Sequence, residues 1–294
     1  MKKRNFVYFF GALFVFCLLL FGAPRRAEAA YTVSYNSDGS ATLKNQSTGG
    51  TVAKLSVKGE RIGKGIVVTS KNVFYLSYSV GQSKNTYSII QQNLSTGSKK
   101  RLIRLTTVYD SYHIRAIYDG SLYLEATSPG GRGMACRFTV SSKKFEALAN
   151  GSWAFGYKYR FVIDGSANSG MPSPGTCYVY NTKSRNLTVI ATYVLGTGYS
   201  GKYAYFASMK SPSESALVSM QPVSYKIIRY DLSTAGKKTL VSSMKAYRVE
   251  KITANYVYHS GYKTSTGQNV YYRYNIAKKK NVQISEATYR KAVE

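Results

Sequence analysis

Few side chains in this sequence are of the kinds that catalyse reactions. The 294 residues include 13 carboxylates, two histidines and three cysteines. We expect Glu60, Asp110 and Glu250 to be the carboxylates nearest the centre of the folded domain. Glycoside hydrolysis would need two carboxylates roughly 5 to 9.5 Å apart, and nothing in the spacing of these three pairs them. We therefore predict no catalytic residue, and a glycan-active hydrolase is an alternative only.

The motifs of metal, phosphate and serine-nucleophile sites are also missing. His113 and His259 lie in separate predicted strands, with no cysteine or acid at the spacing of a metal site. The paired glycines at 49–50 and 130–131 lack the helix that follows a phosphate loop. No Gly-x-Ser-x-Gly motif occurs. We expect no metal ion and no other cofactor.

The chain begins like a secretory signal peptide. Three basic residues at 2–4 precede a mostly apolar run from Phe6 to Ala23, and Ala27-Glu28-Ala29 offers the small residues of a cleavage site. We predict a leader over 1–29, a single mature domain over 30–294, and a secreted or cell-surface protein of a Gram-positive-type bacterium. An uncleaved membrane anchor is the alternative.

The charge is strongly positive. The sequence holds 41 Lys and Arg against 13 Asp and Glu, a formal net charge of +28, and +24 remains without the leader. Such an excess favours an anionic cell-surface polymer or glycan, or anionic lipid, as partner, and export argues against nucleic acid. The alternative is that the charge only keeps the protein soluble. The 28 tyrosines suit half-exposed strands, and their rings could also stack on sugars.

An internal repeat is the strongest signal. Residues 87–102 (YSIIQQNLSTGSKKRL) and 225–240 (YKIIRYDLSTAGKKTL) are identical at nine of sixteen positions, and read as strand, tight turn and strand. Weaker copies end at Leu55, Leu148, Ile190 and Ile284. The six turns recur about every 46 residues, the length of one four-stranded propeller blade.

Two further strands precede each turn hairpin in units two to six, so each unit has strands a, b, c and d in chain order. The first unit has only three strands, over 31–36 and 41–57. We predict an all-β propeller with six blades of four antiparallel strands. Residues 286–294 would supply the missing strand and close the ring, and no helix is expected beyond the leader. Five blades plus a cap, or seven blades, are alternatives.

The aromatic strand, the later Tyr-x-Ile strand and the Lys-Lys turn resemble secreted six-bladed propellers of the TolB-like and low-density-lipoprotein-receptor-like kind. The resemblance covers about residues 31–290 and marks architecture. It implies binding and scaffold roles, and it supplies no catalytic residue. The Tyr-Trp-Thr-Asp motif of the receptor branch is absent.

Basic residues concentrate at the turns between strands c and d, which must all lie on one face of the disc. We predict that they form a binding rim for an anionic polymer or surface, and that the protein is a monomer. Lys is also a common residue that blocks edge-to-edge aggregation of sheets. Lys183 and Arg185 occupy the turn of unit four, and the predicted binding residues are Lys99, Lys100, Arg101, Lys143, Lys144, Lys237, Lys238, Lys278, Lys279 and Lys280.

The opposite face should carry the long connections over 165–175 and 210–222. The alternative function is therefore a protein-interaction scaffold that uses these loops. Cys136 and Cys177 fall at nearly equivalent positions in the c strands of neighbouring units. Packed sheets lie about 10 Å apart, and a disulfide needs Cα atoms within about 7 Å. We therefore expect two unpaired, mostly buried thiols.

Overall fold

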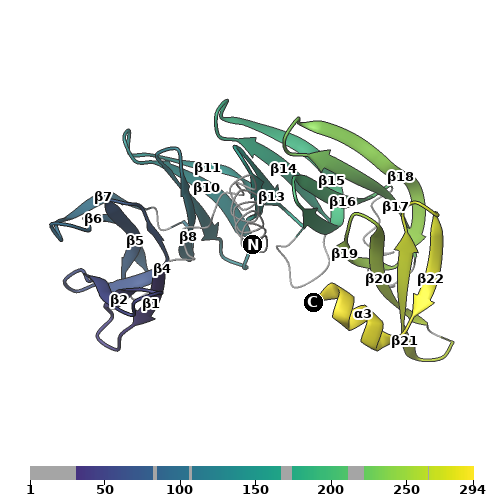
Figure 1. Cartoon of the computed structure of the whole chain (residues 1–294), viewed down its shortest axis with the longest axis horizontal. Coiled ribbons are helices and arrows are strands. Elements are labelled where there is room, and N and C mark those ends of the chain that lie inside the picture. The colour runs from purple at the N-terminus through teal and green to yellow at the C-terminus, as the bar shows by residue number, and fades with distance from the viewer. Residues whose placement is uncertain (1–30, 82–84, 106–107, 167–173, 211–221, 264) are drawn as a thin grey trace, which may run out of the picture.

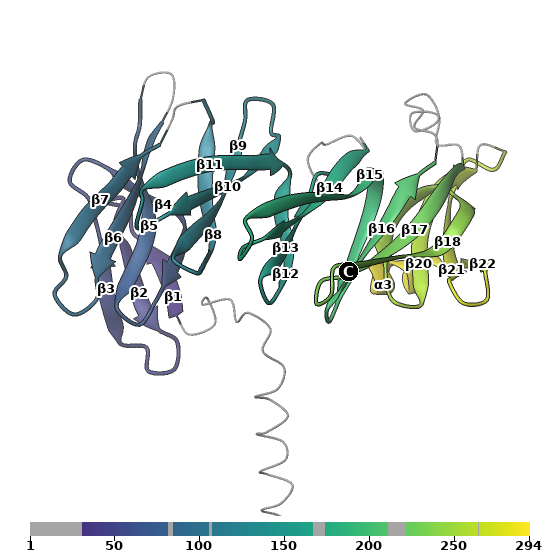
Figure 2. The ribbon, with the colours of Figure 1, turned by 90° about the horizontal axis from the view of Figure 1, so that it is seen from above.

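The computed structural model describes residues 31–81, 85–105, 108–166, 174–210, 222–263 and 265–294. These residues form antiparallel meander sheets, in which each strand pairs with the strand next to it in sequence. Figure 1 shows the sheets side by side along an open arc, and Figure 2 shows the same arc turned by 90°. None of the described helices is long and apolar enough to cross a membrane.

The first three units occupy one arm of the arc. The first unit holds β1 (Tyr31–Tyr35), β2 (Ala41–Asn45) and β3 (Thr51–Leu55). The second holds β4 (Arg61–Val68), β5 (Asn72–Ser79), β6 (Thr86–Asn93) and β7 (Lys99–Arg104). The third holds β8 (Ser111–Tyr118), β9 (Ser121–Thr127), β10 (Gly133–Thr139) and β11 (Lys144–Asn150).

The last three units continue the same order of strands. The fourth holds β12 (Ser152–Tyr157), β13 (Arg160–Asp164), β14 (Gly175–Asn181) and the first part of β15 (Asn186–Ser200). The fifth holds the rest of β15 with β16 (Tyr203–Met209), β17 (Val223–Asp231) and β18 (Gly236–Ala246). The sixth holds β19 (Arg248–Ile252), β20 (Tyr256–Lys263), β21 (Gln268–Asn275) and β22 (Lys280–Ile284).

The predicted propeller of four-stranded sheets is confirmed. β15 serves two units in turn, because Asn186 pairs with Asn181 of β14 while Ser200 pairs with Tyr203 of β16. This one long strand is therefore strand d of unit four and strand a of unit five. In the described residues the first unit has three strands, as predicted, and lacks an inner strand a.

The turns between strands c and d share one local geometry. Asn93 Oδ1 accepts hydrogen bonds from the backbone N–H and the hydroxyl of Ser95, and Asp231 does the same for Ser233. Such short-range contacts stabilise a turn from within its own residues. Each of the six turns also holds one residue with positive φ, namely Gly49, Gly97, Lys143, Arg185, Ala235 and Lys279.

Five clusters of buried apolar side chains join neighbouring units. Leu43 of unit one packs with Tyr75 of unit two, and Leu76 of unit two packs with Ile114 of unit three. Three further clusters join units three to six in order. Each fully buried side chain of this size stabilises the fold by about 1.5–3 kcal/mol. Within the described residues no cluster joins unit six to unit one, so the arc stays open.

The prediction that residues 286–294 add a strand to the first unit is wrong. They form the helix α3 (Glu286–Val293), although no helix was expected there. Ser285 is its N-cap and accepts a hydrogen bond from the backbone N–H of Thr288. Glu286 forms an ion pair with Arg290 one turn later. These short-range contacts favour a helix over a strand.

Helix α3 covers the last unit. Tyr289 is buried, and its ring centroid lies 4.8 Å from that of Tyr271 in β21 and 6.5 Å from that of Tyr258 in β20. Val257 and Tyr274 of the same sheet point into the cluster shared with unit five. Because side chains alternate between the faces of a sheet, α3 packs on the face of unit six that has no neighbouring unit.

The two cysteines are unpaired and buried, as predicted. Cys136 lies in β10 and Cys177 in β14, the c strands of units three and four. Burial raises the pKa of the Cys136 thiol to about 12. The pKa of Cys177 is also raised, chiefly by burial. Both thiols therefore pack as small apolar groups.

Candidate functional site

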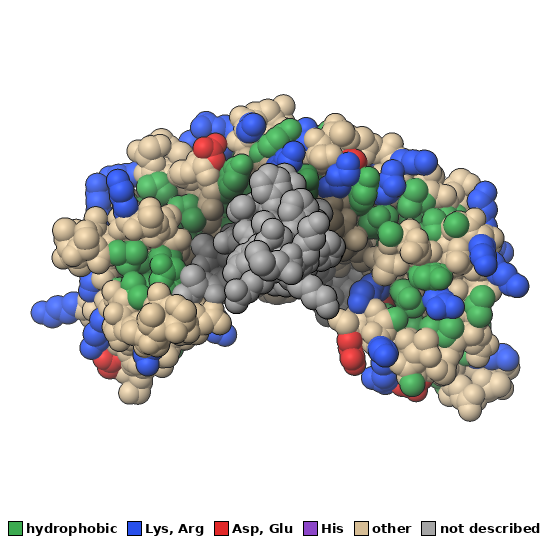
Figure 3. Space-filling model, in the orientation of Figure 1, with side chains coloured by type: hydrophobic (Ala, Val, Ile, Leu, Met, Phe, Trp, Pro, Cys, Tyr) green, Lys and Arg blue, Asp and Glu red, His purple; other side chains and the backbone are tan. Residues whose placement is uncertain are grey.

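All ten predicted binding residues are exposed and lie in the turns between strands c and d or in the strand residues beside them. Figure 3 shows Lys and Arg side chains along the outer edge of the arc. Because each c–d turn follows the same strand direction, the turns lie on one face. We call these ten residues the basic rim: Lys99, Lys100, Arg101, Lys143, Lys144, Lys237, Lys238, Lys278, Lys279 and Lys280.

The basic rim contains two kinds of cation. Four are held by neighbouring groups: carboxylates bind Arg101 and Lys144, and backbone carbonyl oxygens accept hydrogen bonds from Lys99 and Lys237. The side chains of the other six form no ion pair or hydrogen bond with any described residue, and we call them the free rim lysines: Lys100, Lys143, Lys238, Lys278, Lys279 and Lys280.

The three candidate carboxylates do not converge. Glu60 precedes β4 and forms an ion pair with Arg101, with an N–O distance of 2.5 Å. Glu250 lies in β19 in the opposite arm of the arc, where it accepts a hydrogen bond from the hydroxyl of Ser260. Asp110 precedes β8 in unit three. No pair at the spacing of a hydrolase follows from this arrangement.

The two histidines have different surroundings. His259 is buried with its ring 5.1 Å from that of Tyr272, and its Nε2 lies 3.1 Å from Asn281 Oδ1. Burial lowers its pKa to about 4, so this imidazole is neutral at pH 7. His113 lies in β8 at the inner edge of the arc. Across the described part of the chain, no three His, Cys, Asp or Glu side chains gather as metal ligands.

The long loops were expected to bind a protein partner. Residues 167–173 of the first loop and 211–221 of the second lie outside the described residues. The scaffold function therefore stays a prediction.

The innermost strand of every unit from two to six carries a β-bulge where it pairs with strand b. A bulge bends its strand and redirects a side chain from the regular alternation. The added residues are cationic in units two and three, apolar in units four and five, and acidic in unit six. They are Gly63-Lys64-Gly65 in β4, Arg115 in β8, Ala154 in β12, Leu195 in β15 and Glu250 in β19.

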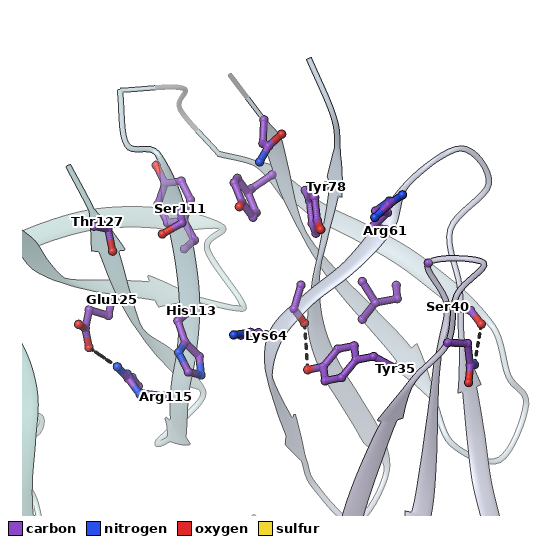
Figure 4. Close-up of a pocket in the computed structure, with 17 residues that line it drawn as sticks. Tyr35, Ser40, Arg61, Lys64, Tyr78, Ser111, His113, Arg115, Glu125 and Thr127 are labelled. Carbon is purple, nitrogen blue, oxygen red and sulfur yellow. Dashed lines mark hydrogen bonds and ion pairs between the residues drawn. The ribbon is translucent and has the colours of Figure 1, made fainter. Parts of the chain in front are cut away.

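The bulge in β4 depends on its second glycine. Gly65 has φ of +83°, and a Cβ atom there would lie 2.3 Å from the ring of His113 and from the carbonyl oxygen of Ile114. Only glycine allows the backbones of β4 and β8 to come this close. Lys64 therefore projects from the bulge toward β8, as Figure 4 shows.

Beside this bulge a cleft of about 660 Å³ opens between units one, two and three. Its walls include the starts of β4 and β8 and the ends of β5 and β9, so it opens on the face opposite the c–d turns. Figure 4 shows side chains from all three units around it. We call it the inner cleft, and its charged and aromatic residues are Tyr35, Arg61, Lys64, Tyr78, Tyr87, Tyr112, His113, Arg115 and Glu125.

The inner cleft carries an excess of positive charge. Arg115 donates to Glu125 over 2.9 Å, and the hydroxyl of Ser152 donates to the other oxygen of this carboxylate over 2.8 Å. The one acid in the lining is thereby satisfied. Arg61 and Lys64 are exposed and form no ion pair or side-chain hydrogen bond with a described residue. Two uncompensated cations therefore face the space.

Tyrosines form much of the remaining wall. Tyr35 is 50% exposed, and its hydroxyl donates to the carbonyl oxygen of Gly63 over 3.4 Å. Tyr78 stacks on Tyr87 with ring centroids 5.3 Å apart, and Tyr87 packs edge-on against Tyr112. Burial raises the pKa of Tyr87 and of Tyr112. Both hydroxyls therefore stay protonated near pH 7, while the rings of Tyr35 and Tyr78 are the more exposed part of this wall.

The inner cleft was not predicted from the sequence. One signal was present: Lys64 stands between two glycines directly before the apolar run Ile66, Val67 and Val68. A glycine inside a strand often marks a bulge or a close approach of backbones. The remaining residues come from three units, and their meeting depends on how the arc curves.

Comparison with protein-family models and with characterised protein sequences gives no match. Among solved structures, TolB from Acinetobacter baumannii aligns with 92% of this chain and 67% of its own, at 15% identity and a TM-score of 0.35. Oligogalacturonate lyase from Vibrio parahaemolyticus aligns with 90% of this chain and 77% of its own, at 9% identity and a TM-score of 0.41. The β-propeller domain of the Trilobed protease from Pyrococcus furiosus aligns with 79% of this chain and 72% of its own, at 9% identity and a TM-score of 0.36.

The fold follows from the sheets of the chain itself. Repeated four-stranded meanders, packed face to face around a common centre, define a β-propeller protein. The export signal and the TolB-like family stay predictions.

Proposed function

We propose that this chain is an exported, non-catalytic propeller that binds an anionic polymer or surface through its free rim lysines. One observation supports the proposal: cations without a partner among the described residues recur at equivalent turns of units two, three, five and six. A polyanion that presents charges at intervals can engage several such turns together. A cell-wall polymer, an acidic glycan and an anionic lipid surface all have this property.

The free rim lysines suit weak, repeated contacts. An exposed ion pair contributes only about 0.2–1 kcal/mol, so a single turn would bind almost nothing. Contacts on several turns of one rigid scaffold act together, because the second contact forms at a high effective concentration. Four contacts of about 0.5 kcal/mol each give about 2 kcal/mol, or roughly 30-fold in affinity.

The test compares two sets of four lysines in the predicted mature chain, residues 30–294. The rim variant replaces one free lysine in each of four units: Lys100→Gln, Lys143→Gln, Lys238→Gln and Lys279→Gln. The control variant removes the same charge from other exposed lysines: Lys210→Gln, Lys245→Gln, Lys263→Gln and Lys291→Gln. Binding to teichoic acid, polygalacturonate and anionic vesicles is measured at 50 and 200 mM salt.

We expect the rim variant to bind polyanions about 30-fold more weakly and the control variant to bind almost as the unchanged chain does. Binding should also weaken steeply with salt, because counterions screen exposed charges. Equal losses in both variants would show that only net charge matters. Binding that is equally tight at the two salt concentrations would contradict the proposal.

A further inference from the structure

The inner cleft offers three things that the basic rim lacks: a recessed but open volume, aromatic walls and several hydrogen-bonding groups around one space. Its volume of about 660 Å³ falls within the range of small-molecule sites. We propose that the inner cleft binds an anionic sugar, that is, a short saccharide whose ring carries a carboxylate or a phosphate. This site is separate from the basic rim and lies on the opposite face.

Arg61 and Lys64 would hold the anionic group. Both lie in β4, both are exposed, and neither has a side-chain partner among the described residues. The turn of unit one lies against Arg61, because a Cβ on Gly39 would come within 2.9 Å of its Cγ. The stem of Arg61 is thereby confined while its guanidinium stays open. Guanidinium groups bind carboxylate and phosphate through two parallel hydrogen bonds, and an ammonium adds a point charge.

Tyr35 and Tyr78 would hold the sugar ring. Tyr35 stands on the innermost described strand of unit one, across the space from β8, and Figure 4 shows Lys64 and Arg61 on the strand nearest to it. Tyrosine offers a flat apolar face together with a hydroxyl, which suits an amphipathic sugar ring. Ser111, Asn85 and Thr127 add polar groups to the same lining.

The charge balance selects an anionic ligand over a neutral one. Glu125, the acid of the lining, is already satisfied by Arg115 and Ser152. No described carboxylate remains to neutralise Arg61 and Lys64, so an anion gains two charged contacts that a neutral sugar cannot make. The modest volume and three-sided walls favour a ligand of a few rings over a long polymer lying flat.

The chain supplies a matched control for the two cations. Arg248 and Lys251 occupy β19, the innermost strand of unit six, with the same spacing as Arg61 and Lys64 in β4. They lie in the other arm of the arc. The pair Arg61→Gln with Lys64→Gln is therefore compared with Arg248→Gln with Lys251→Gln in residues 30–294.

Isothermal titration calorimetry and saturation-transfer NMR would use three probes: digalacturonate, glucose 6-phosphate and maltose. We expect one or both anionic sugars to bind, maltose to bind at least tenfold more weakly, and the variant at 61 and 64 to lose at least tenfold in affinity. The control pair and the rim variant should stay within twofold. Digalacturonate and glucose 6-phosphate separate a carboxylate ligand from a phosphate ligand.

A charge-preserving variant, Arg61→Lys with Lys64→Arg, keeps both cations but moves the guanidinium, so it should bind more weakly than the unchanged chain and at least threefold more tightly than Arg61→Gln with Lys64→Gln. That difference separates lost charge from a folding defect. Three results would overturn the inference: no binding of either anionic sugar, equal binding of maltose, or full binding after Arg61→Gln with Lys64→Gln. Because polyanion binding by the rim variant is measured separately, failure here leaves the proposed function of the basic rim standing.

Discussion

Replacement of Tyr289 by alanine should destabilise the fold strongly, because this ring fastens α3 to the free face of unit six. Tyr289 is 3% exposed and lies between Tyr271 and Tyr258. A buried tyrosine removes about 150 Å² or more from water, which at ~25 cal/mol per Å² stabilises the fold by about 4 kcal/mol. For a domain of this size that is a fall in melting temperature of about 10 °C.

The matched control is Tyr289→Phe, which keeps the ring and removes only the hydroxyl. We expect this change to cost less than about 1 kcal/mol. Both variants would be unfolded in urea, followed by circular dichroism, and by calorimetry on residues 30–294. If Tyr289→Ala costs no more than Tyr289→Phe, α3 does not cover the end of the arc and our account of the last unit is wrong.

Two further predictions concern buried titratable groups. Cys136 and Cys177 should not react with Ellman's reagent in the native protein and should both react after unfolding, because burial raises the pKa of each thiol; rapid native labelling would refute this. His259 has a folded pKa of about 4 against 6.5 for the free side chain, so unfolding exposes a group that takes up a proton below pH 6.5. The contribution of His259 to the free energy of unfolding should be constant above that pH and should fall by up to about 3 kcal/mol between pH 6.5 and 4. His259→Gln should reduce the slope of the free energy of unfolding against pH between pH 6.5 and 5. An unchanged slope would contradict the assignment of this pH dependence to His259.

The blades could be predicted because the information that forms them is local. The side chains of Asn93 and Asp231 build their turns from contacts within three residues, so each turn leaves its own mark in the sequence. The strands on either side then follow from alternation and length. The same reasoning placed Cys136 and Cys177 in neighbouring sheets.

The C-terminal helix was missed for a different reason. Ser285, Glu286 and Arg290 form a helix start and an ion pair one turn apart, and this pattern was visible in the sequence. The expectation of a closed ring assigned the segment to a strand instead. The unit count alone does not decide whether an arc closes, because closure depends on the packing angle at every interface between units.

The basic rim could be located from the sequence, but its division into held and free cations could not. Lys237 reaches the carbonyl oxygen of Ile190, a residue of the preceding unit. Arg101 reaches Glu60 in the connection between β3 of unit one and β4 of unit two. Contacts of this kind depend on how neighbouring units pack against each other. The sequence of a single turn therefore does not predict them.

The inner edge is where the units stop resembling one another. Every innermost strand from unit two to unit six has a bulge at nearly the same level, so the backbone feature repeats while the side chain it presents does not. Lys64 and Arg115 stand in one arm, and Glu250 stands in the other. Lys64, Arg115 and Glu250 belong to none of the apolar clusters between units, whereas Leu195 packs against the cluster of units five and six. Selection can therefore change the charged side chains at 64, 115 and 250 with little cost to these clusters, which makes them positions where binding specificity can be set.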